Sequence, residues 1–492
     1  MLSSYLAITP EIGLIILAAI VLVYGRKPEG ERKRHIGVFT AWGSGIILVW
    51  TLCMWYFLGQ PSSEPVELWG GMFRHDMVTL VFRFMFLTAL TITSLITVDV
   101  KRLQHGEFYA LMTLATVGFS LMAAASDVIL LYIALETASI AFYILSGFAT
   151  DARRSPEAGI KYFVYGAFAS GVMLYGLSLL YGFIAFRVGP TESPTSLYVI
   201  ARTVVNASSN PLVLLSAIMV VVGFGFKISA VPFHFWAPDV YEGAPTSTTA
   251  ILSTASKAAG FAVFLRLFTA GTFGSPSPEN WWAVIVAMSI ATMTLGNFAA
   301  IYQSNIKRML AYSSVAQAGY VLVGLVTFDA TGAGAAMFYL LLYVFTNIAA
   351  FGVVILVSNV SGSDEIADLS GLSRRSPYLA LVMLFALLSL GGIPPTAGFF
   401  GKFFLFKAAV DNNLWWLALI GILNAFIGLY YYLNVIKYIY LYRSEEEDTP
   451  IPVSRAAQVA LILSTAGVIY LGVMPNAFFE WTTEAAQAFF IG

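Results

Sequence analysis

Long apolar runs divide this sequence into about fourteen segments, and this pattern limits the possible folds more than any other feature. Each run has roughly 20 mostly apolar residues, the length that a helix needs to cross the hydrocarbon core of a bilayer. We therefore expect an all-α polytopic membrane protein. The predicted spans are 6–25, 36–59, 77–98, 108–125, 127–149, 158–186, 211–231, 245–270, 281–303, 309–327, 333–358, 378–407, 413–441 and 454–475.

Composition supports a membrane location, because 59% of the 492 residues are hydrophobic and only 11% are charged. A net charge of −1 argues against a nucleic-acid partner. Cys53 is the single cysteine, and the four histidines are too scattered for a metal site. The chain has no glycine-rich nucleotide-binding motif. We therefore expect no cofactor and no metal in this chain.

Lysine and arginine alternate between the two sides of the predicted bundle. The loops after odd-numbered segments are rich in these residues, whereas the other loops carry few: Arg74, Arg187 and Arg202. Because cytoplasmic loops carry the excess of positive charge, this bias predicts odd-to-even loops in the cytoplasm and both termini outside. The first apolar run has no basic segment before it and no small-residue cleavage site, so we expect it to be a retained helix and not a signal peptide.

Five ionisable residues lie inside apolar runs: Glu136, Lys161, Lys227, Lys257 and Lys402. A charge at membrane depth costs roughly 3 kcal/mol on insertion scales, and such residues usually face a bundle interior or a water-filled path. They often mark an ion or proton route, so we take these five as candidate relay residues.

The surroundings differ among the five. Glu136 is far from both ends of its run, and its short side chain cannot reach an interface. Lys161 is near the start of its segment, so both an interfacial lysine and a relay residue fit it. Lys227 precedes a proline break, where its pKa would respond to a nearby carboxylate. Small residues around Lys257 would admit a neighbouring helix or water.

Other polar and aromatic residues receive more ordinary interpretations. Arg266 is expected to anchor a helix end at the membrane interface, and Lys407 to extend toward water. His234, Asp239 and Glu242 follow the proline break and fit either a capped loop or a proton entry. The aromatic residues near segment ends, such as those at 415–416 and 430–432, are expected to form interfacial belts.

Two segments are interrupted by proline, and each carries a lysine at the interruption. Lys227 precedes Pro232 in the seventh segment, and Lys402 follows Pro394 and Pro395 in the twelfth. The interruptions are five segments apart, and an odd offset reverses the direction of the chain across the membrane. Inverted repeats with broken helices are a known way to build ion sites in transporters. The spacing therefore predicts an inverted five-helix repeat.

Four motifs resemble the antiporter-like membrane subunits of respiratory complex I, an NADH:quinone oxidoreductase. They are GFGFKISAVPFHFWAPDVYEGAPT at 223–246, STASK at 253–257, NIKRMLAYSS at 305–314 and GGIPPTAGFFGKF at 391–403. The resemblance covers nearly the whole chain. Within the family the chain is most similar to the N-type subunits, equivalent to mitochondrial subunit 2, because Lys402 stands where the M type is expected to carry glutamate.

The resemblance implies fourteen transmembrane helices, with helices 4–8 and 9–13 as inverted repeats and helices 7 and 12 broken. It divides the chain into 1–105 (three N-terminal helices), 106–275 (first repeat), 276–442 (second repeat) and 443–492 (C-terminal helix). It implies that Glu136 and Lys227 form a pair and that Lys161 extends this region. Lys257 would be the central relay, Lys402 would serve the second half-channel, and His234 would link toward the centre.

The resemblance also implies a function and partners. The chain would translocate protons while NADH, FMN, iron–sulfur clusters and quinone act in partner subunits. Partners would be a neighbouring M-type subunit, small K- and J-type subunits, the peripheral redox arm and lipids. The expected location is a bacterial inner membrane. Alternatives are a subunit of a multisubunit Na⁺/H⁺ antiporter, a structural subunit that conducts nothing, and a solute permease.

Overall fold

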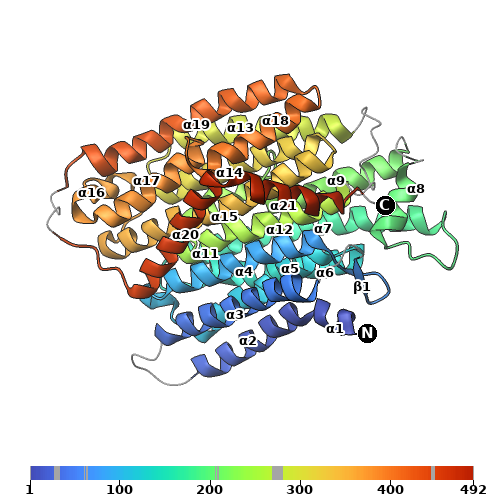
Figure 1. Cartoon of the computed structure of the whole chain (residues 1–492), viewed down its shortest axis with the longest axis horizontal. Helices are drawn as coiled ribbons and strands as arrows, with labels where there is room; N and C mark the ends of the chain where they lie inside the picture. The colour runs from blue at the N-terminus through green and yellow to red at the C-terminus, as the bar shows by residue number, and fades with distance from the viewer. Residues whose placement is uncertain are drawn as a thin grey trace.

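The computed structural model describes residues 2–26, 34–59, 61, 65–205, 207, 210–268, 281–444 and 449–490. Long helices make up nearly all of it (Figure 1). The described strands form one antiparallel hairpin of β1 (Val66–Leu68) and β2 (Phe73–His75), in which Glu67 pairs with Arg74. An all-α membrane fold is confirmed.

The helices follow one another along the chain with short connections. Their bounds are α1 (Leu2–Ala7), α2 (Thr9–Gly25), α3 (Arg34–Leu58), α4 (Met77–Thr97), η2 (Lys101–Leu103), α5 (Gly106–Ala124), α6 (Val128–Ser146), α7 (Arg154–Ala185), α8 (Leu197–Val205), α9 (Pro211–Ile228), α10 (Trp236–Gly243), α11 (Thr246–Ile251), η3 (Leu252–Ser256), α12 (Lys257–Phe268), α13 (Trp281–Ile301), α14 (Ile306–Val326), α15 (Ala330–Ser361), η4 (Ile366–Leu369), α16 (Leu372–Arg375), α17 (Pro377–Gly391), α18 (Ala397–Asp411), α19 (Trp415–Leu441), α20 (Arg455–Val473) and α21 (Pro475–Gln487).

Each of the fourteen predicted segments has a helix in the structure. Twelve helical stretches of the described chain are long and apolar enough to cross a membrane, and two shorter apolar helices, α2 and α17, complete the set. The predicted segment 378–407 contains both α17 and most of α18. The last two residues of the predicted segment 245–270 lie outside the described residues. The sequence analysis missed α21, whose mixed composition hides it from a search for apolar runs.

Short polar side chains start several of these helices. The carboxylates of Asp76, Asp127 and Asp329 accept hydrogen bonds from backbone N–H groups in the first turns of α4, α6 and α15. The side chain of Asn305 does the same for α14. Such caps satisfy N–H groups that have no partner within the helix, so they fix where each helix begins.

Both predicted breaks are present. The helix α9 ends at Ile228, where Ser229 takes a left-handed backbone conformation with φ of 60°, and α10 starts only at Trp236. The helix α17 ends where Gly392 has φ of 82°, and α18 starts at Ala397. Proline cannot donate the backbone hydrogen bond that would continue a helix, so these interruptions follow from local sequence.

A third irregularity was not predicted. Between α11 and α12, the segment η3 forms a π-helical turn, and Lys257 follows it directly. Residues 247–268 of this helical stretch are all buried. Wider turns of this type are frequent at functional sites, because the added residue changes which side chains face a given neighbour.

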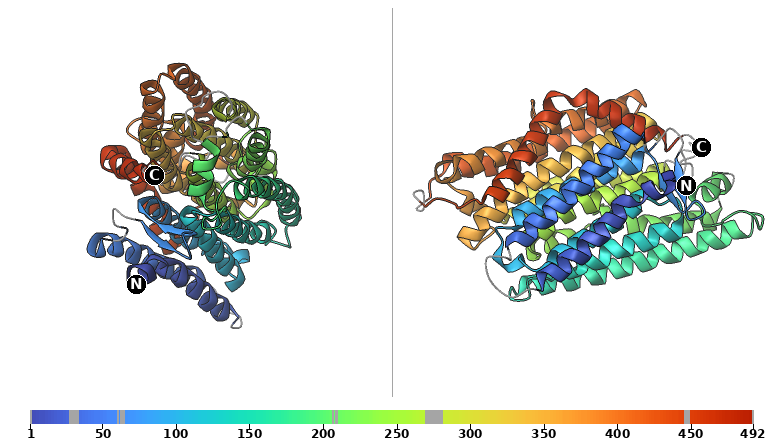
Figure 2. Two further views of the ribbon diagram at one scale, coloured as in Figure 1. Left: turned by 90° about the vertical axis from the view of Figure 1, so that its right-hand side faces the viewer. Right: turned by 60° about the horizontal axis from the view of Figure 1, so that its bottom comes forward.

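The helices lie side by side in one bundle (Figure 2). The N-terminal helices α2, α3 and α4 form one flank, whereas α13 and α19 lie on the opposite side (Figures 1 and 2). The 32-residue helix α15 runs through the interior, where it packs against α14, α17, α18, α20 and α21. The predicted division of the chain into four units and the inverted relation between two of them stay predictions.

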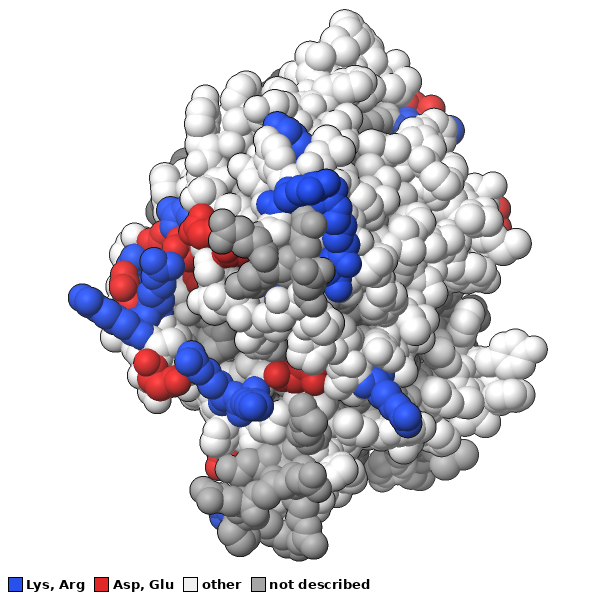
Figure 3. Space-filling view, turned by 90° about the vertical axis from the view of Figure 1, so that its left-hand side faces the viewer, with Lys and Arg blue, Asp and Glu red and all other residues white. Residues whose placement is uncertain are grey.

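Charged side chains gather at one end of the bundle. Ion pairs connect separate elements there, as between Arg102 and Asp151 and between Arg308 of α14 and Glu242 of α10. Figure 3 shows this end with its lysine, arginine and acidic side chains among many uncharged ones. Both termini lie at the other end (Figure 1). The chain therefore separates its basic loops from its termini as the charge pattern predicts, while the assignment of the cytoplasmic side stays a prediction.

Replacement of Gly106 by alanine is expected to separate α5 from α2. A Cβ atom at residue 106 would lie 2.8 Å from the Cα atom of Gly25 and 2.8 Å from the carbonyl oxygen of Val21, and backbone cannot easily move aside. Overpacking of this kind costs about 1–3 kcal/mol, so the unfolding temperature of the purified protein should fall. Gly182→Ala is the matched control, because open space surrounds that position. Equal unfolding temperatures for the two variants would contradict this packing.

Candidate functional site

Three of the predicted relay lysines are buried in the interior of the bundle. Lys227 is 2% exposed, Lys257 3% and Lys402 6%. Lys227 lies in the last turn of α9, Lys257 begins α12 after the π-helical turn, and Lys402 is in the second turn of α18. Each therefore lies beside an irregularity of its helix. Among the described residues, no carboxylate is within ion-pair distance of these three lysines.

Lys227 contacts α6 through a hydroxyl group. Its ammonium nitrogen donates a hydrogen bond of 3.1 Å to the hydroxyl of Ser139, which in turn donates to the carbonyl of Leu135. The described ion pairs include none between Lys227 and Glu136, and the predicted pairing of these two residues stays a prediction. Glu136 lies about one turn before Ser139, is half-buried, and has an Oε1 atom without a hydrogen-bond partner. Lys227 therefore contacts α6 through Ser139, and Glu136 acts on it through its charge.

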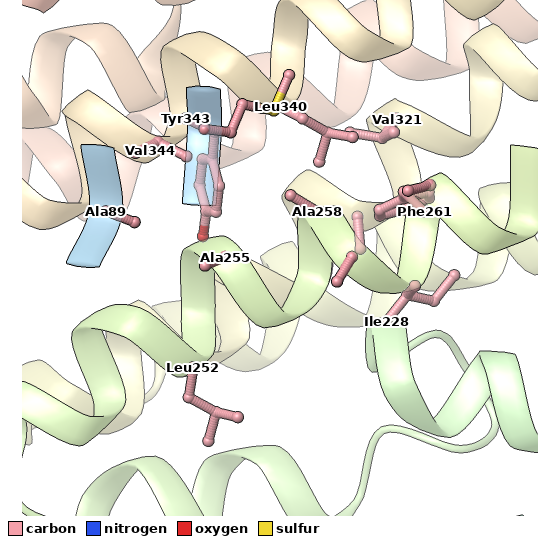
Figure 4. Close-up of a cluster of buried hydrophobic side chains, with 14 of the residues drawn as sticks. Ala89, Ile228, Leu252, Ala255, Ala258, Phe261, Val321, Leu340, Tyr343 and Val344 are labelled. Carbon is pink, nitrogen blue, oxygen red and sulfur yellow. The ribbon is translucent and has the colours of Figure 1, made fainter. Parts of the chain in front are cut away.

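Lys257 is held at the centre of the bundle by a backbone carbonyl. Its ammonium nitrogen donates a hydrogen bond of 2.7 Å to the carbonyl oxygen of Ser314 on α14. Apolar side chains enclose this region, with Ala258 and Phe261 from α12 facing Val321 and Leu340 (Figure 4).

A small cavity adjoins Lys257. It has a volume of about 10 Å³ and is lined by Lys257, Phe261, Ser314, Gln317, Ala318, Val321, Tyr339, Leu340 and Tyr343. A cavity needs roughly this volume to hold one water molecule, and a buried water needs at least two polar partners. The ammonium of Lys257 and the side chains of Gln317 and Tyr339 supply such partners. The cavity therefore places Lys257 beside polar side chains of α14 and α15.

Lys402 contacts the carbonyl groups that the second break leaves free. Its ammonium nitrogen donates to the carbonyl oxygens of Leu390 at 2.8 Å and Gly391 at 3.2 Å, at the end of α17. The nitrogen also lies 4.9 Å from the ring centre of Tyr320, within range of a cation–π interaction. The interruption of the helix thus supplies the oxygen atoms that hold the lysine.

Gln317 connects the central cavity to the site of Lys402. Its amide nitrogen donates to the carbonyl of Leu390, which also accepts from Lys402, and to the hydroxyl of Tyr432 at 2.9 Å. Its amide oxygen accepts from Tyr339. The hydroxyl of Tyr432 forms a further hydrogen bond of 2.5 Å with Ser313. Polar groups therefore continue from Lys257 to Lys402.

Sequence reasoning missed this connection. Tyr431 and Tyr432 were assigned to an interfacial belt, but both are buried, and Tyr431 donates to Asn297. That assignment is wrong for these two tyrosines, although Tyr430 is exposed as expected. The available signal was Gln317, a polar amide in the middle of an apolar run, which needs hydrogen-bond partners wherever it is buried.

Lys161, Asp239 and Glu242 lie apart from the buried lysines, in a charged cluster at the end of the bundle. The ammonium of Lys161 is 2.9 Å from Asp239 on α10 and 2.9 Å from Glu157, one turn earlier on its own helix. Its side chain is 39% exposed, which fits the interfacial lysine that the sequence left open, and its part in a relay stays a prediction. Burial alone would raise the pKa of Asp239, but its hydrogen bonds from Lys161 and Arg308 hold that pKa below its usual value.

His234 lies in the connection after the first break. It is buried, and its Nδ1 atom has no hydrogen-bond partner. A buried ring nitrogen without a partner is costly unless a water molecule or a movement of the chain satisfies it. The placement fits a link toward the centre of the bundle, and the role of His234 stays a prediction.

A second group of buried charges lies near the other end of the bundle. Arg83 on α4 donates to both carboxylate oxygens of Glu11 on α2 and to Nδ1 of His75. Burial and the charge of Arg83 lower the pKa of His75 to about 3, so its ring is neutral and can accept this hydrogen bond. Sequence analysis did not single out Glu11 or Arg83, although both are charges within or beside apolar runs.

Arg266 belongs to the same region. Its guanidinium donates to both carboxylate oxygens of Asp76, at 2.8 and 3.1 Å, and to the carbonyl of Ala123. The prediction of an interfacial anchor is wrong, because Arg266 is buried. Burial alone would raise the pKa of Asp76, but Arg266 lowers it below its usual value. These paired charges join α4 to α5 and α12.

The sequence matches a family model described as NADH:quinone oxidoreductase/Mrp antiporter, TM, over residues 125–428. The chain belongs to this family. It is 42% identical over 489 residues to NADH-quinone oxidoreductase subunit N of Moorella thermoacetica, with 98% of each chain covered. It is 45% identical over 479 residues to the subunit of the same name from Heliobacterium modesticaldum, with 96% of each covered.

Solved structures show the same fold. A chain of respiratory complex I from Thermus thermophilus with bound aureothin has a TM-score of 0.77 and 31% identity, covering 96% of this chain and 98% of that one. A chain of an Mrp complex from a Dietzia species has a TM-score of 0.86 but only 21% identity, covering 100% and 98%. The second likeness shows the shared fold alone.

Proposed function

We propose that the chain is a proton-translocating membrane subunit, of the N type, in a bacterial NADH:quinone oxidoreductase. The observation that carries this proposal is the set of three buried lysines at helix irregularities, each hydrogen-bonded to a carbonyl or hydroxyl and not to a carboxylate. Such a lysine can exist in charged and neutral forms, because no counter-charge fixes its proton. Family membership and the relatives named subunit N support the same function.

In this proposal the protons move along a series of groups near the middle of the bundle. Changes in the field of Glu136 alter how tightly Lys227 holds its proton, since an opposite charge nearby favours the charged form. Lys257 passes the proton across the small cavity toward Lys402, and Gln317 holds the hydroxyl groups of Tyr339 and Tyr432 in position between them. Because these groups interact, their protonation is coupled and each transfer changes the next. Lys161, His234, Asp239 and Glu242 act in accessory positions.

The electron-transfer chemistry belongs to partner subunits in this proposal. NADH, FMN, iron–sulfur clusters and quinone react there, and their turnover drives the field changes at Glu136. Neighbours would include an M-type antiporter-like subunit, K- and J-type subunits, the peripheral arm and lipids. We place the chain in the inner membrane with its basic loops in the cytoplasm and both termini outside.

An Na⁺/H⁺ antiporter subunit is the second candidate function, and one observation favours it: the description of the matching family names the Mrp antiporter beside NADH:quinone oxidoreductase. The sequence identity of 21% to the Mrp complex chain is half of the 42% to the Moorella subunit, so the complex I assignment is better supported.

Alanine in place of Glu136 or Lys227 tests the proposal. Quinone reduction and the resulting pH gradient are measured together in native membranes. We expect both to fall at least about tenfold, because the coupled step loses its charge change. The control is Lys407→Ala, whose exposed side chain pairs with Asp411 one turn away. Unchanged reduction and pH gradient in the assembled complex would make these two residues structural charges and the relay wrong.

A further inference from the structure

The charged cluster at the end of the bundle surrounds a cavity of about 210 Å³. Six of its lining residues are charged, three basic and three acidic: Arg154, Glu157, Lys161, Asp239, Glu242 and Arg308. They come from the first turns of α7, from α10 and from the first turn of α14. The end of the bundle where such charges gather is the one seen in Figure 3. A polar cavity of this volume is large enough for several water molecules.

Ion pairs tie α10 to the helices on either side of it. Asp239 pairs with Lys161 of α7 at 2.9 Å and with Arg308 of α14 at 2.8 Å. Glu242 pairs with Arg308 at 2.9 Å and with Arg154 of α7 at 3.0 Å. The helix α10 has eight residues and follows the break after α9. A short helix between two irregular connections can move more easily than the long helices around it, and these four ion pairs help to hold it against α7 and α14.

Behind the cluster, buried hydroxyl groups lead toward Lys257. Tyr162 directly follows Lys161, and Tyr241 lies on α10 between the two acidic residues; the hydroxyls of both tyrosines are buried and have no hydrogen-bond partner. The side chain of Tyr162 lies near that of Ser256, and the side chain of Tyr241 near that of Ser314.

The two serines bring this series of hydroxyls to Lys257. Ser256 precedes Lys257 in the chain, and the carbonyl of Ser314 accepts the hydrogen bond from Lys257. The hydroxyls of Ser256 and Ser314 are also buried without a partner. A hydroxyl group can both accept and donate a hydrogen bond, so this series of buried hydroxyls, together with water, could pass a proton from the cavity to Lys257.

We propose that the ion pairs of Asp239 and Glu242 form a latch on α10 that closes a water entry leading from the charged cavity to Lys257. When Asp239 parts from Lys161 and Arg308, α10 moves and water reaches the hydroxyls behind it. A hydronium ion then gives its proton through water and hydroxyl groups, each of which accepts one proton and passes on another. Neutral Lys257 becomes an ammonium and the hydronium becomes water. This inference rests on the proposed function and adds to it the gate formed by the ion pairs of α10.

Thiol accessibility tests the latch. Cys53 is the single cysteine of the chain, so Cys53→Ser with Ser256→Cys gives one buried thiol behind the cluster. The assembled complex is placed in vesicles with the basic end outward, and the rate at which Ag⁺, a soft ion that binds thiolates, blocks this thiol is measured. We expect Asp239→Asn to raise the rate at least about tenfold, because it weakens two charge-assisted hydrogen bonds that favour the closed position.

A matched control lies in the same cavity. Glu157 pairs with Lys161 on the same helix, so Glu157→Gln removes one acidic charge without releasing α10 from a neighbour. We expect its rate to stay within about twofold of the parent. Glu242→Gln gives a second test of the latch, should Asp239→Asn prevent assembly, and is expected to raise the rate as well.

Equal rates in all these proteins, or an equal increase with Glu157→Gln, would overturn the latch. Reaction of the thiol from the opposite side of the membrane would overturn it too. These outcomes do not depend on pumping, so they leave the proposed function standing. Conversely, accelerated labelling in Asp239→Asn together with normal pumping in variants of Glu136 and Lys227 would support the water entry and refute the relay.

Discussion

Replacement of Lys257 by methionine is expected to lower donor-driven proton translocation by more than about tenfold while the complex still assembles. Methionine has a similar length and is more easily buried, so the fold should tolerate it. The variant loses the group that donates to the carbonyl of Ser314 and that borders the small cavity next to Gln317. Without an ionisable group at this position, a proton has no site between Lys227 and Lys402.

An arginine at position 257 distinguishes a proton relay from a charge that only stabilises the structure. Lys257→Arg keeps the positive charge, but a guanidinium group does not release its proton in proteins. A relay therefore fails with arginine, whereas a structural charge is restored by it. The pH gradient formed during quinone reduction is measured for both variants, with Lys437→Met, an exposed position on α19, as the control. Normal pumping by either Lys257 variant would exclude a proton relay through this residue.

Replacement of Arg83 by methionine is expected to have the largest effect on stability. It leaves the carboxylate of Glu11 buried between α2 and α4 without its counter-charge. Removal of one partner of a buried ion pair costs about 3–5 kcal/mol, much more than the net contribution of the pair itself. The unfolding temperature of the purified protein should fall strongly, and the N-terminal helices should become accessible to protease first.

The double variant Glu11→Leu with Arg83→Met provides the internal control. Two apolar side chains that replace a buried ion pair often restore stability, because no charge has to lose its water. We therefore expect the double variant to unfold at a higher temperature than Arg83→Met alone. Arg202→Met, which breaks an exposed ion pair with Glu192, should leave the unfolding temperature unchanged. A mild effect of Arg83→Met would show that water reaches Glu11.

Local sequence was sufficient for the positions of the helices and their breaks. Apolar runs of membrane length form helices whatever surrounds them, because every backbone group must find a partner within the segment. Proline and glycine interrupt a helix through their own backbone limits, so the breaks near Pro232 and Gly392 could be predicted. A lysine inside an apolar run is also visible without a structure, which is why Lys227, Lys257 and Lys402 were found in advance.

The sequence by itself thus determined the all-α membrane fold, the two predicted breaks and the buried lysines. Only the tertiary structure decided which groups meet. Arg83 and Glu11 are 72 residues apart in the chain, and Gln317 and Tyr432 are 115 apart. Lys227 donates its hydrogen bond to Ser139 and not to Glu136. Many of these helices are apolar on most sides, so their sequences have no clear apolar stripe that indicates which face is inward. The partners of a buried charge then depend on how neighbouring helices pack, and that is a property of the whole bundle.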